Sequence, residues 1–253
     1  MFNDRAVNPA ARCEAQCSRL TMPLLKPPLL LISSLCVHIA LTSPNLPASS
    51  TEVSRYKDRW NKTWIKWGPT YLKALYWVLS LCEAAVICAQ DAPSPAYTLV
   101  RSSSSSAPSH PTITAPFMAG WVLITFAGIL RLICYRTLGR FFTFELSIRD
   151  KHKLITSGPY GWVRHPSYSG AILSLIGYFV CMWGPGSLLY ECGWVTTVVG
   201  KAALVGMAAQ LAWVASVLVW RPIQEDEVLR QEFGSQWDDW AQRVRYRLVP
   251  GIY

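Results

Sequence analysis

The feature that most constrains this chain is a series of apolar stretches almost free of charged side chains. A helix needs about 20 largely apolar residues to cross a bilayer, and residues 166–190 and 202–220 meet that requirement. Charged residues make up only 15% of the 253 residues, too few to cover a water-facing surface. We therefore expect an all-α integral membrane protein. Three weaker stretches are residues 27–50, most apolar over 29–41; residues 74–90, interrupted by Glu83; and residues 112–130, ended by Arg131.

The charge distribution predicts how these stretches cross the membrane. The chain carries 24 Lys and Arg against 15 Asp and Glu, a net charge of +9. The basic residues flank apolar stretches, notably over residues 55–66 and 131–164, which indicates cytoplasmic loops beside anionic lipid and disfavours a nucleic-acid partner. With the charged tail from Arg221 on the same side, about five transmembrane helices and a luminal N-terminus are expected.

Composition divides the chain into three parts. Residues 1–22 form a polar extension that ends at Met22, an alternative start of the chain. Residues 23–140 hold the N-terminal apolar stretches and a low-complexity, Ser- and Pro-rich loop over 91–112, which we expect to be luminal. Residues 141–253 hold most of the polar motifs that follow the first three stretches.

The cysteines do not indicate a metal site. None of the eight forms a C-x-x-C pair, and five lie within apolar stretches, where small apolar side chains pack between helices. We expect neither a metal centre nor a disulfide framework.

Two polar segments adjoin the ends of apolar stretches on the predicted cytoplasmic side. One is HKLITSGPYGWVRHPSYSG, residues 152–170, where Gly158, Pro159 and Gly161 indicate a turn and Pro166 disfavours helix at His165. The other is WRPIQEDEVL, residues 220–229. Either the first segment is an ordinary loop leading into a helix, or the two together form a polar site at headgroup level.

Arg221 and Glu225 are four residues apart, so they share a face if the last apolar helix continues. Arg221 then either extends to the interface in a weak surface ion pair, or binds a carboxylate through two hydrogen bonds.

The last residues repeat aromatic and apolar side chains at helical spacing (Phe233, Trp237, Trp240 and Val244). This pattern predicts a C-terminal amphipathic helix that lies on the membrane or caps the site.

These motifs, taken in order, resemble the isoprenylcysteine carboxyl methyltransferase family. The motifs are HKLITSGPY, RHPSYSG, R-x-x-x-E-D-E from Arg221 and FG-x-x-W-x-x-W from Phe233, and they cover roughly the C-terminal half. The resemblance implies an endoplasmic reticulum enzyme that transfers a methyl group from S-adenosyl-L-methionine to the C-terminal carboxylate of a prenylated cysteine. Its partners would be farnesylated or geranylgeranylated proteins, and residues 141–253 would form the catalytic methyltransferase region, with a cytoplasmic cofactor-binding loop.

The resemblance also implies roles for individual residues. Arg221 would be the catalytic residue that faces the substrate carboxylate. Glu145 stands where some relatives have an amide, and Trp237 and Trp240 replace tyrosines common in the family. The expected cofactor-binding residues are Glu145, His152, Lys153, Leu154, Ile155, Tyr160, His165, Pro166, Ser167, Tyr168 and Glu225.

The chemistry fits the residues available. A C-terminal carboxylate with a pKa of about 3.5 is already an anion at neutral pH, so its methylation needs alignment rather than a base. The sequence has no G-x-G-x-x-G signature after a strand, which argues against a soluble Rossmann methyltransferase. Three alternatives stay open. A phospholipid N-methyltransferase would need a base and would not need an arginine at the substrate, and an NADPH-dependent sterol reductase would bind the cofactor's phosphate through Lys153 and Arg164. A non-enzymatic membrane scaffold would not depend on Arg221 or Glu225.

Overall fold

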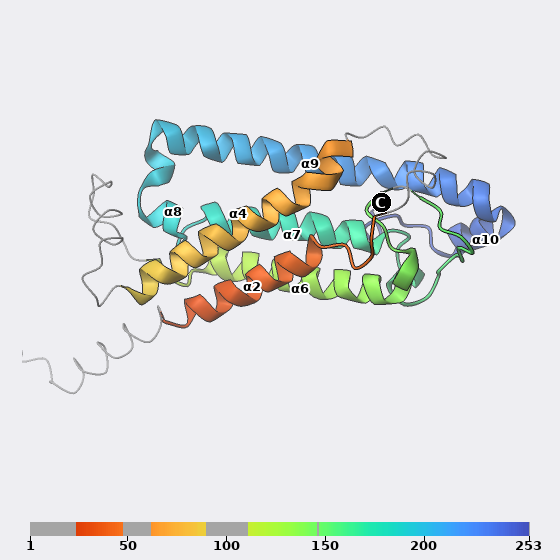
Figure 1. Cartoon of the computed structure of the whole chain (residues 1–253), viewed down its shortest axis with the longest axis horizontal. Coiled ribbons are helices and arrows are strands. Elements are labelled where there is room, and N and C mark those ends of the chain that lie inside the picture. The colour runs from red at the N-terminus through yellow and green to blue at the C-terminus, as the bar shows by residue number, and fades with distance from the viewer. Residues whose placement is uncertain (1–23, 48–61, 90–110, 146, 253) are drawn as a thin grey trace, which may run out of the picture.

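The computed structural model describes residues 24–47, 62–89, 111–145 and 147–252 (Figure 1). The polar extension over residues 1–22 and most of the predicted loop over 91–112 lie outside these described residues. Within the described part every regular element is helical and no strand occurs, which confirms the all-α prediction.

The described residues form five apolar helices, which run along the long axis of the molecule (Figure 1). Four are long and apolar enough to span a membrane, whereas α2, with 15 residues, is about 22 Å long and shorter than a bilayer core. The chain is therefore a multi-pass membrane protein. The helices are α2 (Lys26–Ala40), α4 (Lys62–Cys88), α6 (Ala115–Leu138), α7 (Pro166–Trp183) and α9 (Val198–Phe233).

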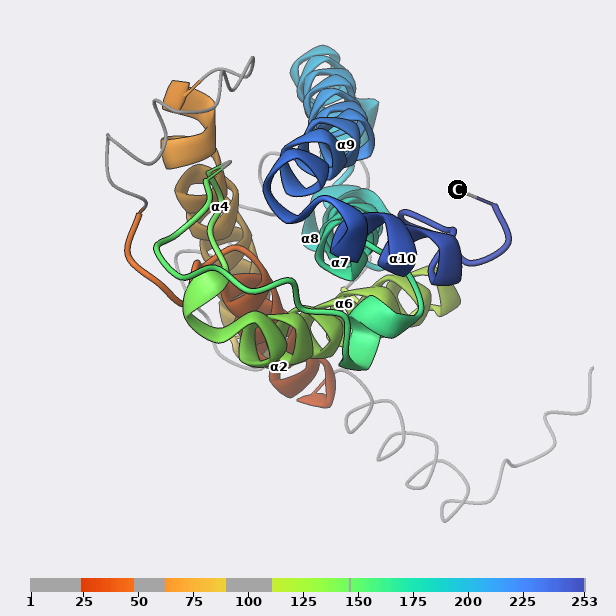
Figure 2. The same ribbon diagram turned by 90° about the vertical axis from the view of Figure 1, so that its right-hand side faces the viewer.

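Close backbone approach brings the central helices α6 and α7 together. A Cβ added at Gly177 would lie 2.6 Å from the Gly120 carbonyl oxygen and 2.8 Å from a side-chain carbon of Ile124, so a glycine is needed at this crossing. The α6–α7 pair forms the most extensive helix contact, α2 and α4 pack on one side of it, and α9 contacts α7. Seen along the bundle, α4 and α9 lie apart (Figure 2).

Two apolar stretches differ from their predicted boundaries. The stretch 166–190 is not one helix, because α7 ends at Trp183, before Gly184 and Pro185, and the short helix α8 (Leu188–Glu191) follows. The stretch 112–130 was expected to end at Arg131, but α6 continues to Leu138 and buries Arg131. The helix persists because the guanidinium finds polar and aromatic partners inside the protein.

The helix α9 is longer than the apolar stretch within it. Its 36 residues correspond to about 54 Å, so it continues beyond a bilayer core and brings Arg221 and Glu225 onto one face. Gly234, with a φ of 52°, ends α9, and α10 (Ser235–Arg243) turns back over the bundle end. Phe233 therefore closes α9 instead of belonging to the predicted C-terminal helix.

A buried ion pair closes the end of the bundle where α2 begins and α4 finishes. Lys26 Nζ lies 2.5 Å from Glu83 Oε1 and donates to the Gly186 carbonyl at 2.6 Å. Glu83 in turn accepts from the Leu188 backbone N–H at 3.0 Å. The charge at Glu83, which interrupts the predicted stretch 74–90, is thus neutralised between α2, α4 and the α7–α8 connection.

Candidate active site

A pocket of about 210 Å³ lies at the opposite end of the bundle, where the α6–α7 loop, the end of α9 and α10 meet. Its apolar side is formed mainly by helical residues: Gly68, Pro69, Leu72, Leu175, Val214 and Leu218. Its polar side brings together the loop before α7 and the last turns of α9. The two polar segments singled out in the sequence therefore face one cavity.

All but two of the predicted site residues line this pocket. Pro166 is buried in the first turn of α7, where its fixed φ suits the start of a helix, and Lys153 is exposed. Neither lines the cavity. The residues that do are Glu145, His152, Leu154, Ile155, Tyr160, His165, Ser167, Tyr168, Arg221 and Glu225.

The loop before α7 is fixed by a short 3-10 turn, η2 (Gly158–Gly161), and by α10. Gly158 has a φ of 60°, a conformation that suits glycine. Trp240 of α10 donates through Nε1 to the Tyr160 carbonyl at 3.1 Å, and its ring is buried beside Tyr160. Burial raises the pKa of Tyr160 well above its usual value, so its hydroxyl stays neutral. The C-terminal helix therefore caps the site, one of its two predicted positions.

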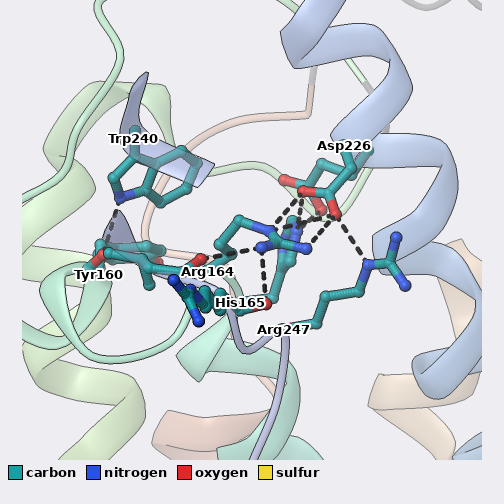
Figure 3. A network of polar contacts seen from close by, with 9 residues as sticks. Tyr160, Arg164, His165, Asp226, Trp240 and Arg247 are labelled. Carbon is teal, nitrogen blue, oxygen red and sulfur yellow. Dashed lines mark hydrogen bonds and ion pairs between the residues drawn. The ribbon is translucent and has the colours of Figure 1, made fainter. Parts of the chain in front are cut away.

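Asp226 is the centre of a buried polar network behind the pocket (Figure 3). Its carboxylate lies 2.9 Å from His165 Nε2, accepts from Arg164 at 3.1 Å, and accepts from Arg247 Nε at 2.9 Å. Because a carboxylate accepts, the hydrogen bond places a proton on His165 Nε2. The other ring nitrogen, Nδ1, lies 3.6 Å from Glu225 Oε2.

The C-terminal segment pairs with the same loop through its backbone. Arg164 N–H donates to the Tyr246 carbonyl at 2.9 Å, and His165 N–H donates to the Arg247 carbonyl at 2.8 Å. The Arg164 guanidinium also donates to the carbonyls of Val244 and Arg245. Three segments distant in the sequence thus hold His165 in one position.

Arg221 and Glu225 project from consecutive turns of α9 into the pocket. Arg221 is buried and donates to the carbonyl of Phe144, next to Glu145 in the chain. Glu225 is half-buried beside His165. A guanidinium and a carboxylate one turn apart can bind an anion and a cation side by side.

His152 provides a buried polar atom without a partner. Its ring lies 4.5 Å from that of Phe141 and 5.8 Å from that of Phe233, and its Nδ1 is buried with no hydrogen-bond partner among the described residues. Burial lowers the pKa of His152, an effect that Glu225 and Glu232 oppose and that Arg140 and Arg149 reinforce. The imidazole is therefore neutral at pH 7 and can bond to a ligand in the pocket.

Sequence reasoning missed three residues in and around the site. Arg131 lines the pocket but was read as the end of a helix. Asp226 was passed over beside Glu225, and Arg247 lies in the tail outside the named motifs. Only Asp226 left a signal in the sequence, because it is a charged residue inside the R-x-x-x-E-D-E motif and lies about 100° around the helix from Glu225.

Comparison with known proteins gives matches that include the loop before α7. Residues 120–192 match the model of the isoprenylcysteine carboxyl methyltransferase family. A probable protein-S-isoprenylcysteine O-methyltransferase of Oryza sativa subsp. indica is 31% identical over 127 residues, which cover 49% of this chain and 56% of the relative. Protein-S-isoprenylcysteine O-methyltransferase B of Arabidopsis thaliana is 32% identical over 132 residues, 49% of this chain and 55% of the relative.

A Delta(14)-sterol reductase of Neurospora crassa also matches, with 27% identity over 126 residues that cover 43% of this chain and 25% of the reductase. The match with the methyltransferases spans just over half of their length. The resemblance to the isoprenylcysteine carboxyl methyltransferase family that the sequence motifs indicated is confirmed by the match of residues 120–192 to the model of that family.

Proposed function

We propose that this protein transfers a methyl group from S-adenosyl-L-methionine to the C-terminal carboxylate of a prenylated cysteine, in the endoplasmic reticulum membrane and with the pocket facing the cytoplasm. The observation that carries this proposal is the place of Arg221. Its buried side chain lines a pocket whose other wall is apolar. An arginine suits a carboxylate and the apolar wall suits a lipid chain.

The apolar wall also supports entry of the substrate from the bilayer. Two of the helices that form it, α4 and α9, lie apart when the bundle is viewed along its axis (Figure 2). Trp67 and Trp220 are 59% and 62% exposed, and each directly precedes a pocket residue, Gly68 and Arg221 respectively. Exposed tryptophans favour the headgroup level of a membrane, so a prenyl chain between α4 and α9 would place its carboxylate beside Arg221.

The polar wall fits the proposed cofactor. The unpartnered Nδ1 of His152 and the carboxylates of Glu145 and Glu225 line it, and carboxylates suit an ammonium group. His165, Ser167 and Tyr168 line the same wall. When bound, the cofactor supplies an electrophilic methyl group attached to a sulfonium.

The residues of this chain would accelerate the transfer mainly by positioning. Arg221 would orient one carboxylate oxygen without having to remove a proton, because the substrate is already ionised at neutral pH. Holding two reactants in line can supply about 7 to 11 kcal/mol. Burial of Arg221 and Tyr160 limits water around the pocket, which strengthens these electrostatic contacts.

The direct test is transfer of radiolabelled methyl to N-acetyl farnesylcysteine by membranes that contain the chain. Base-labile label is expected for the unchanged protein, and Arg221→Ala should reduce its formation by about 100-fold to 1,000-fold. Arg230→Ala is the matched control, since Arg230 lies on the same helix but is exposed in a pair with Asp238. Absence of base-labile label with the unchanged protein would overturn the proposal.

The sterol reductase match gives a second candidate that the same preparation can test. A reductase would consume NADPH in the presence of an unsaturated sterol and would form no methyl ester. Label that resists base and extracts with phospholipid would instead indicate an N-methyltransferase. Arg221 at the pocket favours the carboxylate substrate over both, because the reacting group is an amine in the one alternative and a sterol double bond in the other, and neither is an anion for the guanidinium to orient.

A further inference from the structure

Arg131 is a second cation at the pocket, contributed by a different helix from Arg221. It lies in α6, is 5% exposed and lines the cavity. A Cβ added at Gly170 would lie 2.9 Å from Arg131 Cγ, so the first turns of α7 pack directly against its side chain. Its orientation is therefore set by packing as well as by hydrogen bonds.

The partners of Arg131 in the described part of the chain are all neutral. Its Nε donates to the Tyr135 hydroxyl at 2.9 Å, and its Nη1 donates to the Ser167 carbonyl at 2.8 Å. Its guanidinium carbon lies 5.2, 6.0 and 5.7 Å from the ring centres of Tyr135, Phe142 and Phe144. No ion pair joins it to a described carboxylate.

A buried cation without a counter-ion is costly, and buried charges in proteins are normally paired. Hydrogen bonds fix two nitrogens of Arg131 in one plane, while Nη2 carries two further N–H groups. An arginine within a membrane-spanning helix that faces a cavity is typical of a ligand contact. The buried guanidinium of Arg131 therefore lines the pocket with no ion-pair partner among the described residues.

We propose that Arg131 is a second cationic contact for a carboxylate bound in the pocket. This inference rests on the proposed function, and two molecules could bring the carboxylate. One is the prenylcysteine substrate. The other is S-adenosyl-L-methionine, whose amino-acid end carries a carboxylate.

The test compares Arg131→Met, Arg131→Lys and two controls in the methyl-transfer assay and in thermal-shift titrations. Arg131→Met should raise one of the two KM values by about 10-fold to 100-fold, the effect of removing a charged hydrogen bond, and Arg131→Lys should restore much of it. Tyr135→Phe removes the Nε partner but keeps the charge, and Arg136→Met removes an exposed charge from the same helix. Both should leave the KM values within about 3-fold.

Ligands without a carboxylate distinguish the two sources. If the cofactor brings the carboxylate, Arg131→Met weakens the thermal shift by S-adenosylhomocysteine but not that by methylthioadenosine. If the substrate brings it, Arg131→Met weakens inhibition by an unreactive prenylcysteine carboxylate but not by its amide. A lower melting temperature with both KM values and both titrations unchanged would overturn the inference, whereas failure of the proposed function would appear as no transfer by the unchanged protein.

Discussion

The two ends of the helix bundle both hold buried ion pairs, but only one of them has charged groups that line the pocket. At one end Lys26 and Glu83 neutralise each other, and neither lines the pocket. At the other end Arg131, Arg221 and Glu225 all line it. The Lys26–Glu83 pair joins α2 to α4, whereas the charged groups that line the cavity are placed to contact a ligand bound there. The comparison predicts that substitutions at the first end change stability and those at the second change binding.

The largest effect is expected at the end of the bundle that holds the Lys26–Glu83 ion pair. Lys26→Met or Glu83→Met leaves one charge buried without its partner, which costs about 3 to 5 kcal/mol of stability. The double substitution should recover part of that loss, because no uncompensated charge remains. The measurement is the melting temperature of the three variants in detergent. A changed KM at unchanged melting temperature would contradict the division between the two ends.

A smaller effect is expected at the end of the bundle that holds the pocket. Glu225→Gln removes a half-buried carboxylate from the polar wall and from the contact with His165 Nδ1. The affinity for S-adenosylhomocysteine should fall by about 10-fold to 100-fold, with little change in melting temperature, and isothermal titration measures it. Glu227→Gln is the matched control, since Glu227 is exposed on the same helix. Equal losses in the two variants would exclude a local contact.

The smallest effect is a pH dependence. Burial lowers the pKa of His152 below 6.5, so the ring is neutral near pH 7 and acquires a positive charge only as the pH falls through the lowered value. That charge would repel a sulfonium, so cofactor affinity should be constant from about pH 8 to about pH 6.5 and drop by several-fold at lower pH. The affinity of His152→Asn, measured across the same range, should lack this drop. A drop of equal size in the variant would assign the dependence to another group.

The sequence predicted the parts of the fold that depend on local pattern. The apolar stretches, the start of α7 at Pro166 and the shared face of Arg221 and Glu225 follow from composition and helical spacing, and the structure has them. The roles of the motif residues stay predictions. The sequence left two positions open for the C-terminal amphipathic helix, on the membrane or over the site. The hydrogen bond from Trp240 to Tyr160 shows that it lies over the site.

The failures have a common physical cause, which is that long-range partners decide where a charge can be buried. Arg131 was expected to end a helix because hydropathy counts an arginine as a break. It stays within α6 because the carbonyl of Ser167, 36 residues away, accepts a hydrogen bond from its guanidinium. Asp226 likewise depends on Arg164, 62 residues before it. Neither partner can be identified from spacing along the chain.

The pairing of the loop before α7 with the C-terminal segment has a consequence for the order in which the protein is made. The Arg164 guanidinium donates to the carbonyls of Val244 and Arg245, which lie 80 and 81 positions later in the chain. Both residues follow the last membrane-spanning helix. While the chain is being synthesised from its N-terminus, all five apolar helices exist before those carbonyls do. The contacts that fix the loop before α7 can therefore form only after the last apolar helix has been synthesised, and a nascent chain that ends before Val244 cannot complete the pocket.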